Sequence, residues 1–251
     1  MMSNLNRWLA CAKAGPSSKF RLFCFPYAGG SGSIFLKWQE HMPATVEVCA
    51  AQLPGRGPRL TEPPYTSCRP LVLSAAQALK PHFEKPFALF GHSMGALISF
   101  ELAVHLRSEY GLEPAALFVS GCRAPHARGN GHKSYDLPEP EFIEELRRLG
   151  GTPSEAFEFE ELMRLVLPTL RADFELSQTY EYSRTEPLGC PIIAWGGHDD
   201  EEVKRDHLEA WRNLTTSAFA LHMLPGDHFF LHSSQDILLK TLREHLRQLA
   251  L

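Results

Sequence analysis

The sequence predicts an α/β fold in which a mostly parallel sheet is covered by helices on both of its faces. Six short runs of strand length are apolar at successive residues rather than at every second residue. This pattern is typical of parallel strands that are buried on both faces. Helical patterns lie between most of these runs, and the alternation of strand and helix favours a parallel sheet.

The expected elements form one alternation with a single interruption. Strands are expected at residues 20–25, 46–51, 87–90, 116–120, 192–195 and 219–224. Helices around the sheet are expected at about residues 67–83, 96–110, 201–213 and 234–249. The chain has 251 residues and contains no internal repeat or low-complexity linker. Because this length is enough for one large domain with a substantial core, we expect residues 1–251 to form a single domain.

Residues 125–187 interrupt the alternation, since they contain no strand-like run. Helical patterns at residues 139–149, 154–166 and 168–182 lie between two expected strands. Open α/β sheets bind ligands at the carboxyl ends of their strands, so this insertion is predicted to be a helical lid over those ends. The alternative is that the helices only cover the edge of the sheet. The lid is favoured because many apolar residues occur where little sheet is left to cover: Phe142, Phe157, Phe159, Leu162, Met163, Leu165 and Phe174.

Composition excludes several classes of protein. The formal net charge of −4 lacks the basic excess of nucleic-acid-binding proteins. The apolar runs are far shorter than the roughly 20 residues that span a bilayer, and residues 1–14 lack the apolar core of a signal peptide. The six cysteines are scattered without a C-x-x-C pair. We therefore expect a cytoplasmic protein with reduced thiols that binds neither nucleic acid nor membrane.

The segment Gly91-His92-Ser93-Met94-Gly95 is the most informative motif of the chain. It has the form G-x-S-x-G and lies between an expected strand and an expected helix. In this context the motif predicts a strained turn that presents the serine hydroxyl at the top of the sheet, at a helix N-terminus. Ser93 is therefore the candidate nucleophile. A Gly/Ser turn without a chemical role is the alternative.

A serine hydroxyl is a poor nucleophile unless a base removes its proton and an acid orients that base. In α/β-hydrolases these partners follow the serine in the order acid, then histidine. The loop after the strand at 192–195 supplies Asp200, with the neighbouring Asp199 as the alternative acid. The loop after the last strand supplies His228, which has the right chain position and a glycine nearby. His92 adjoins the serine, but its side chain is expected to point away from it.

The spacing of the histidines and glycines predicts neither a metal site nor a cofactor site. His228 and His232 are four residues apart, but the glutamate of H-E-x-x-H and a third ligand are missing. The Gly-rich loop at residues 25–32 contains neither G-x-G-x-x-G nor G-K-[ST], so it does not predict a nucleotide site. Glycines there allow the backbone to approach a substrate closely. We therefore expect the oxyanion hole to use the backbone N–H groups of Ala28, in that loop, and of Met94.

Five segments of the chain, in this order, resemble those of type II thioesterases, the stand-alone editing hydrolases that accompany polyketide synthases and non-ribosomal peptide synthetases. The resemblance extends over about residues 20–240. The serine elbow is shared with many hydrolases, whereas the other segments are more specific in combination. The segments are Phe25-Pro26-Tyr27-Ala28-Gly29-Gly30, Gln52-Leu53-Pro54-Gly55-Arg56-Gly57, Gly91-His92-Ser93-Met94-Gly95, Leu167-Pro168-Thr169-Leu170-Arg171-Ala172-Asp173-Phe174 and Gly226-Asp227-His228-Phe229-Phe230.

The resemblance implies an α/β-hydrolase fold and a function. The implied substrate is an acyl or aminoacyl thioester on the phosphopantetheine arm of a carrier protein, and the implied role is to clear stalled or misprimed modules. It places the triad on Ser93, Asp200 and His228 and the oxyanion donors on Ala28 and Met94. A medium-chain acyl-carrier-protein thioesterase of fatty acid synthesis and a small-molecule serine esterase are the alternatives. Whether Arg56 contacts the substrate, contacts the carrier protein or only forms part of a surface turn stays open.

Overall fold

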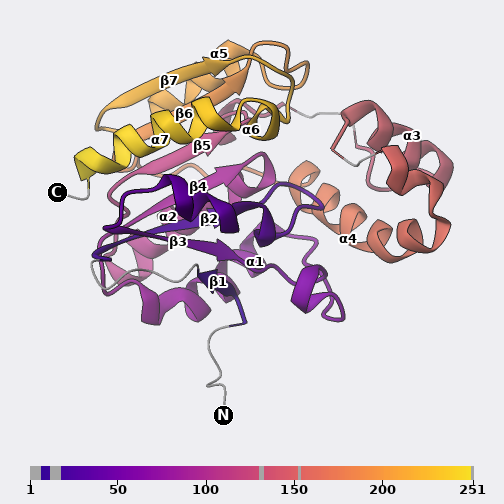
Figure 1. The fold of residues 1–251 in the computed structure, drawn as a ribbon, viewed down its shortest axis with the longest axis horizontal. Helices are drawn as coiled ribbons and strands as arrows, with labels where there is room; N and C mark the ends of the chain where they lie inside the picture. The colour runs from indigo at the N-terminus through magenta and orange to yellow at the C-terminus, as the bar shows by residue number, and fades with distance from the viewer. Residues whose placement is uncertain (1–6, 12–17, 130–132, 152–153, 250–251) are drawn as a thin grey trace.

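A seven-stranded sheet forms the centre of the molecule, in the spatial order β1-β3-β2-β4-β5-β6-β7 (Figure 1). The computed structural model describes residues 7–11, 18–129, 133–151 and 154–249. Neighbouring strands from β2 to β7 are parallel, and β1 is antiparallel to β3. The strands are β1 (Leu9–Cys11), β2 (Phe20–Phe25), β3 (Val46–Ala51), β4 (Phe87–His92), β5 (Leu117–Ser120), β6 (Ile192–Gly197) and β7 (Phe219–Leu224). The expected mostly parallel sheet is confirmed.

Helices cover both faces of the sheet, as expected. On one face lie α1 (Cys68–Leu79), α2 (Met94–Tyr110), α5 (Arg205–Glu209) and η6 (Ala210–Leu214). On the other lie η1 (Gly32–His41), α6 (Phe230–Ser233) and α7 (Gln235–Leu249). The short 3₁₀ turns are η2 (Gly57–Arg59), η3 (Lys80–His82) and η4 (Pro125–Ala127). Within the described ranges, no helix is long and apolar enough to cross a membrane.

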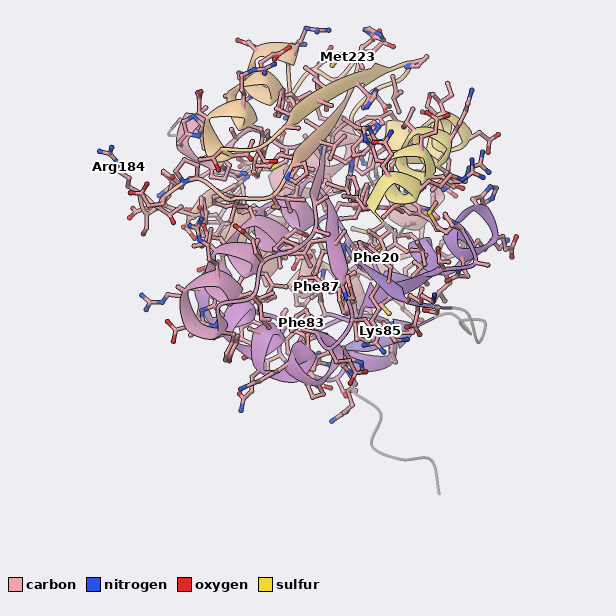
Figure 2. The ribbon with its side chains drawn as sticks, turned by 90° about the vertical axis from the view of Figure 1, so that its left-hand side faces the viewer. Phe20, Phe83, Lys85, Phe87, Arg184 and Met223 are labelled. Atoms are coloured by element: carbon pink, nitrogen blue, oxygen red, sulfur yellow. The ribbon has the colours of Figure 1, made fainter. Side chains whose placement is uncertain are left out.

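The central strand β4 shows why successive residues are apolar. Leu89 is buried on the face of α1 and α2, whereas Phe90 is buried on the opposite face against Phe35 and Trp38 of η1. Because neighbouring side chains of a strand point to opposite faces, both faces need apolar residues. At the start of β4 the rings of Phe83 and Phe87 lie side by side, with centroids 4.7 Å apart (Figure 2).

The helical insertion between β5 and β6 projects from one side of the sheet, where α3 (Glu139–Leu149) and α4 (Glu160–Gln178) lie apart from α7 (Figure 1). It also contains η5 (Ser154–Glu158). The expectation of separate helices at 154–166 and 168–182 is wrong, because α4 is continuous and contains Pro168. Proline removes one helical hydrogen bond. Burial of Met163, Leu167 and Leu170 against α3 offsets this loss.

Two other boundaries differ from expectation. The expected helix at 201–213 begins only at Arg205, because the backbone N–H groups of Glu202 and Val203 donate to the Asp200 carboxylate instead of starting a helix. Strand β1 was not expected at all. A three-residue strand shows no periodicity, and β1 is defined by its pairing with β3.

The turn at Ser93 connects β4 to α2 and is strained. Ser93 has φ 53° and ψ −116°, and it is the only non-glycine residue with positive φ in the described part of the chain. The turn brings the backbone on either side of Ser93 into close contact with neighbouring backbone atoms. A Cβ atom on Gly91 would lie 2.0 Å from the Gly95 carbonyl oxygen, and one on Gly95 would lie 2.1 Å from the Phe25 carbonyl oxygen. Both positions therefore require glycine.

Replacing Gly95 by alanine is expected to destabilise the fold by about 3 kcal/mol or more, because backbone atoms cannot move away from the added carbon as a flexible side chain could. Urea unfolding measures the change. Gly129→Ala is the matched control, since no atom lies within 4 Å of its added carbon, and it is expected to change stability by less than about 0.5 kcal/mol. Equal stability of the two variants would contradict the close approach.

Candidate active site

Asp200 and His228 form a hydrogen-bonded pair between the loops that follow β6 and β7. The distance from His228 Nδ1 to Asp200 Oδ2 is 2.8 Å. The Asp200 side chain is fully buried, whereas the His228 side chain is 18% exposed. The other carboxylate oxygen, Oδ1, accepts the backbone N–H groups of Glu202 at 2.8 Å and Val203 at 2.9 Å. Asp200 therefore holds the histidine ring in one orientation, with Nδ1 as the donor.

The surroundings of Asp200 favour its ionised form. Burial opposes ionisation, but hydrogen bonding and attraction to His228, together with the two backbone N–H bonds, outweigh it and hold the pKa of the carboxyl below its usual value. Asp200 is therefore a carboxylate wherever His228 functions as a base. A carboxylate at this place can stabilise the positive charge that the imidazole gains when it accepts a proton.

Asp199, the alternative acid, lies differently. Its side chain is exposed, and its backbone N–H donates to the Gly226 carbonyl oxygen. The structure thus brings Asp200, and not Asp199, to His228.

The other histidines of this region have different partners. His92 is fully buried, and its Nδ1 is hydrogen-bonded to the Ser120 hydroxyl at 2.8 Å. Burial, reinforced by the neighbouring His228 and His232, places the pKa of His92 well below its usual value, so this ring stays neutral. His232 Nε2 is 3.0 Å from the Tyr27 hydroxyl. His228 and His232 are thus held by separate partners rather than pointing to a shared ligand.

A cavity of about 350 Å³ brings the candidate residues together. Ser93 and His228 both line it, and so do Ala28 and Met94. Within the described part of the chain, the Ser93 hydroxyl makes no direct hydrogen bond to His228. Such contacts are often long in unliganded enzymes and shorten when substrate binds. The helical insertion supplies much of the remaining wall: Arg128, Gly129, Glu145, Leu146, Arg148, Leu149, Gly151, Leu170, Phe174, Ser177, Gln178 and Tyr180.

Two backbone N–H groups are available at this cavity. Met94 is the first residue of α2, so its N–H has no acceptor within the helix. Ala28 is the second residue of a β-turn in which the Gly30 N–H donates to the Tyr27 carbonyl oxygen and Gly29 has φ 76°, as in a type II turn. No described residue accepts the Ala28 N–H. These two donors can stabilise negative charge on an oxygen bound between them.

Arg56 lies in the interior, which answers the question left open by the sequence. It is 5% exposed and forms a two-point ion pair with Asp173, which is 1% exposed and lies on α4. Arg56 therefore does not face a carrier or a substrate. Asp173 received no role in the sequence analysis, although it lies in one of the family-like segments. An acidic residue within a helical segment rich in apolar residues was the available signal.

The Thioesterase domain family model matches residues 20–246. The linear gramicidin dehydrogenase LgrE of Brevibacillus parabrevis is 47% identical over 245 residues, which cover 96% of this chain and 93% of the relative. Two solved structures are also similar. RedJ, a thioesterase from the prodiginine pathway of Streptomyces coelicolor, is 40% identical, with TM-score 0.86 and coverage of 93% and 94%. YbtT, a type II thioesterase from the yersiniabactin NRPS/PKS pathway, is 31% identical, with TM-score 0.84 and coverage of 97% and 100%.

A relative from fatty acid synthesis is less similar in sequence than LgrE and RedJ. The medium-chain S-acyl fatty acid synthase thioesterase of Anas platyrhynchos is 38% identical over 222 residues, which cover 86% of this chain and 87% of the relative. The matched regions cover between 86% and 97% of this chain.

Asp200→Asn is expected to lower kcat for an acyl thioester by about 10⁴-fold, because the asparagine amide can donate to His228 Nδ1 and favour the wrong tautomer. Asp199→Asn is the matched control and is expected to leave kcat nearly unchanged, since its carboxylate is exposed. Steady-state hydrolysis of acetyl-pantetheine measures both. A larger loss for the Asp199 variant would reassign the acid.

Proposed function

The chain belongs to the thioesterase family and is a hydrolase of thioesters, and we propose that it is the editing enzyme of a peptide or polyketide assembly line. In this proposal it acts in the cytoplasm on acyl or aminoacyl groups that are bound to the phosphopantetheine arm of a carrier protein. Hydrolysis removes stalled or misprimed groups and frees the arm. The similar thioesterases that are named for the prodiginine pathway and the yersiniabactin NRPS/PKS pathway support this substrate.

The proposed reaction begins at Ser93. The hydroxyl attacks the thioester carbonyl carbon while His228 Nε2 takes its proton, and Asp200 stabilises the resulting imidazolium through Nδ1. The N–H groups of Ala28 and Met94 hold the oxyanion. The tetrahedral intermediate then collapses: the carbon–sulfur bond breaks, and the pantetheine sulfur leaves with the proton from His228. Ser93, His228, Ala28 and Met94 all line one cavity, and Asp200 binds His228 from the buried side; that arrangement is the observation that carries the proposal.

The second half of the reaction repeats the first with water. His228 removes a proton from a water molecule that attacks the acyl-enzyme, and the same two N–H groups hold the second oxyanion. The Ser93 oxygen leaves with the proton from His228, and the carboxylic acid is released. Every step uses protein groups and water, so the proposal requires no metal and no organic cofactor.

The helical insertion is proposed as the lid of the site. Its residues form much of the cavity wall, and Arg148 of α3 reaches across to Glu202 in the Asp200 loop, with 2.9 Å between Arg148 Nη1 and Glu202 Oε1. Both side chains are about half exposed, so this ion pair can break at a small energetic cost. Such a contact suits a lid that opens when the acyl group enters.

The name of LgrE raises oxidoreduction as an alternative activity. A dinucleotide-dependent enzyme needs a site for the pyrophosphate, and its usual signature is G-x-G-x-x-G after a strand. The loop after β2 runs Pro26-Tyr27-Ala28-Gly29-Gly30 and lacks this pattern. The serine elbow and the Asp200–His228 pair instead match the needs of acyl transfer.

The deciding experiment compares hydrolysis of an acetyl-phosphopantetheinyl carrier protein with hydrolysis of acetyl-pantetheine. We expect kcat/KM to be roughly tenfold or more higher on the carrier, which corresponds to about 1.4 kcal/mol of carrier binding. Ser93→Ala is expected to abolish both activities without loss of fold, as measured by circular dichroism. Equal rates on both thioesters would indicate a general esterase. A preference for long acyl chains would favour the fatty acid role, and oxidation of NADPH with an aldehyde would favour oxidoreduction.

A further inference from the structure

Three of the five family-like segments meet at one buried carboxylate. Asp173 Oδ2 accepts the Gly29 N–H at 2.7 Å and lies 2.5 Å from Arg56 Nη1. Asp173 Oδ1 accepts from Arg56 Nη2 at 2.7 Å. Asp173 is on α4, Gly29 is in the turn after β2, and Arg56 is in the loop after β3. A single side chain thus connects the insertion to two loops at the carboxyl end of the sheet.

Further contacts hold α4 against the same loops. The Thr169 hydroxyl donates to the Gly55 carbonyl oxygen at 2.6 Å, and the Arg56 guanidinium also donates to the Pro54 carbonyl oxygen through Nε and Nη2, each at 3.2 Å. A Cβ atom on Gly29 would lie 2.5 Å from the Leu170 side chain. The turn therefore packs directly on α4.

A stability role alone does not account for this arrangement. A buried ion pair adds little net stability, because the loss of hydration of both charges opposes their attraction. What the pair does supply is a fixed acceptor for the Gly29 N–H. That N–H belongs to the Ala28–Gly29 peptide, which is the unit whose orientation differs between type I and type II turns. The bond to Asp173 selects the orientation seen here, and the adjacent Ala28 N–H stays unengaged at the cavity.

We propose that Asp173, held in place by Arg56, is a positioning residue for the oxyanion hole. Its carboxylate fixes the turn from Tyr27 to Gly30 so that the Ala28 N–H stays directed at the substrate carbonyl. This inference rests on the proposed function, since it requires hydrolysis through Ser93 and an oxyanion held by Ala28 and Met94. Asp173 does not touch the reacting atoms.

The test measures transition-state binding separately from stability. Asp173→Ala is expected to lower kcat on acetyl-pantetheine by about 10²–10³-fold, the usual effect of losing one oxyanion donor, with KM little changed. The affinity for a trifluoromethyl ketone analogue, whose adduct with Ser93 carries an oxyanion, is expected to fall by a similar factor. Asp173→Asn keeps one oxygen for the Gly29 N–H and is expected to lose less than Asp173→Ala.

Leu246→Ala is the control for stability, because Leu246 is fully buried on α7, on the far face of the sheet. It should lower the melting temperature without changing kcat or the ketone affinity. If Asp173→Ala behaves in the same way, the positioning role is wrong. If that variant does not fold, Asp173→Asn and Arg56→Lys decide by the same two readouts. A wild-type enzyme that neither hydrolyses the thioester nor binds the ketone would instead refute the proposed function.

A second and independent observation lies at the lateral edge of the sheet, where β1 pairs with β3. Cys11 of β1 and Cys49 of β3 are direct cross-strand partners, and their Sγ atoms are 2.7 Å apart. Cys11 is exposed, whereas Cys49 is fully buried. Cross-strand Cα spacings of about 4.5–5.5 Å fall within the range that a disulfide can bridge. The hydrogen bond from Cys49 lowers the pKa of the Cys11 thiol; partial burial and the nearby Glu47 oppose this shift, and Arg21 adds to it.

We infer that Cys11 and Cys49 form a thiol oxidation site for hydroperoxides. The Cys11 thiolate attacks one peroxide oxygen, the oxygen–oxygen bond breaks, and an alcohol or water leaves after protonation, which yields a sulfenic acid. The Cys49 thiol then attacks the Cys11 sulfur, a sulfur–sulfur bond forms, and water leaves. Two thiols are oxidised, and the peroxide is reduced. The product ties the edge strand β1 covalently to the sheet.

Equimolar hydrogen peroxide is expected to remove two hydrogens from the intact mass and to raise the melting temperature, and dithiothreitol should reverse both. Peptide mapping should locate the bond between Cys11 and Cys49. Cys11→Ser should abolish the change, whereas Cys190→Ser, at a buried cysteine away from this pair, should not. Oxygen addition at Cys11 without loss of the Cys49 thiol would overturn the inference, and so would a disulfide that joins other cysteines.

Discussion

The backbone conformation of Ser93 is the constraint on which the rest of the site depends. A serine at φ 53° is unfavourable in isolation, so the surrounding structure must enforce it. The enforcement comes from close backbone contact: Gly95 lies against the Phe25 carbonyl, at the end of the strand that precedes the oxyanion turn. The Ser93 N–H also donates to the Ser120 carbonyl oxygen at 2.7 Å. The elbow is therefore fixed by β2 and β5, the two strands that pair with β4. The loops that follow these two strands also line the cavity.

This constraint explains how distant loops converge without a cofactor to organise them. Parallel strands end at one edge of the sheet, so the segments after β2, β4, β6 and β7 reach the same place. The proposed catalytic groups then differ in burial in a way that suits their roles. Asp200 is fully buried and stays ionised, whereas His228 is partly exposed and reaches the cavity. The neutral His92 ring packs against the His228 ring, with centroids 5.3 Å apart, so it adds no positive charge beside His228.

Local patterns predicted most of the fold and the family. The resemblance to type II thioesterases is confirmed by the family match and the relatives, and strands Phe20–Phe25, Val46–Ala51 and Phe219–Leu224 lie at the expected residues. Most of the failures involve contacts between residues far apart in the sequence; the late start of α5 is the exception, because the Asp200 carboxylate accepts N–H groups only two and three residues away. Pro168 signals a helix break locally, but packing of α4 on α3 overrides it. Strand β1 exists through its pairing with β3. The Arg56–Asp173 pair joins residues 117 positions apart, which no spacing along the chain can indicate.

Helix α4 shows why the insertion and the oxyanion turn cannot be treated as separate parts. Leu170 and Phe174, four residues apart, line the cavity, whereas Thr169 and Asp173, also four apart, bind the two loops. Residues at this spacing share one side of a helix, so adjacent sides of α4 serve the cavity and the loops. A displacement of α4 away from the sheet would therefore widen the cavity and at the same time withdraw the acceptor of the Gly29 N–H. Closure of the insertion and the direction of the Ala28 N–H therefore both depend on the contact between α4 and the turn after β2.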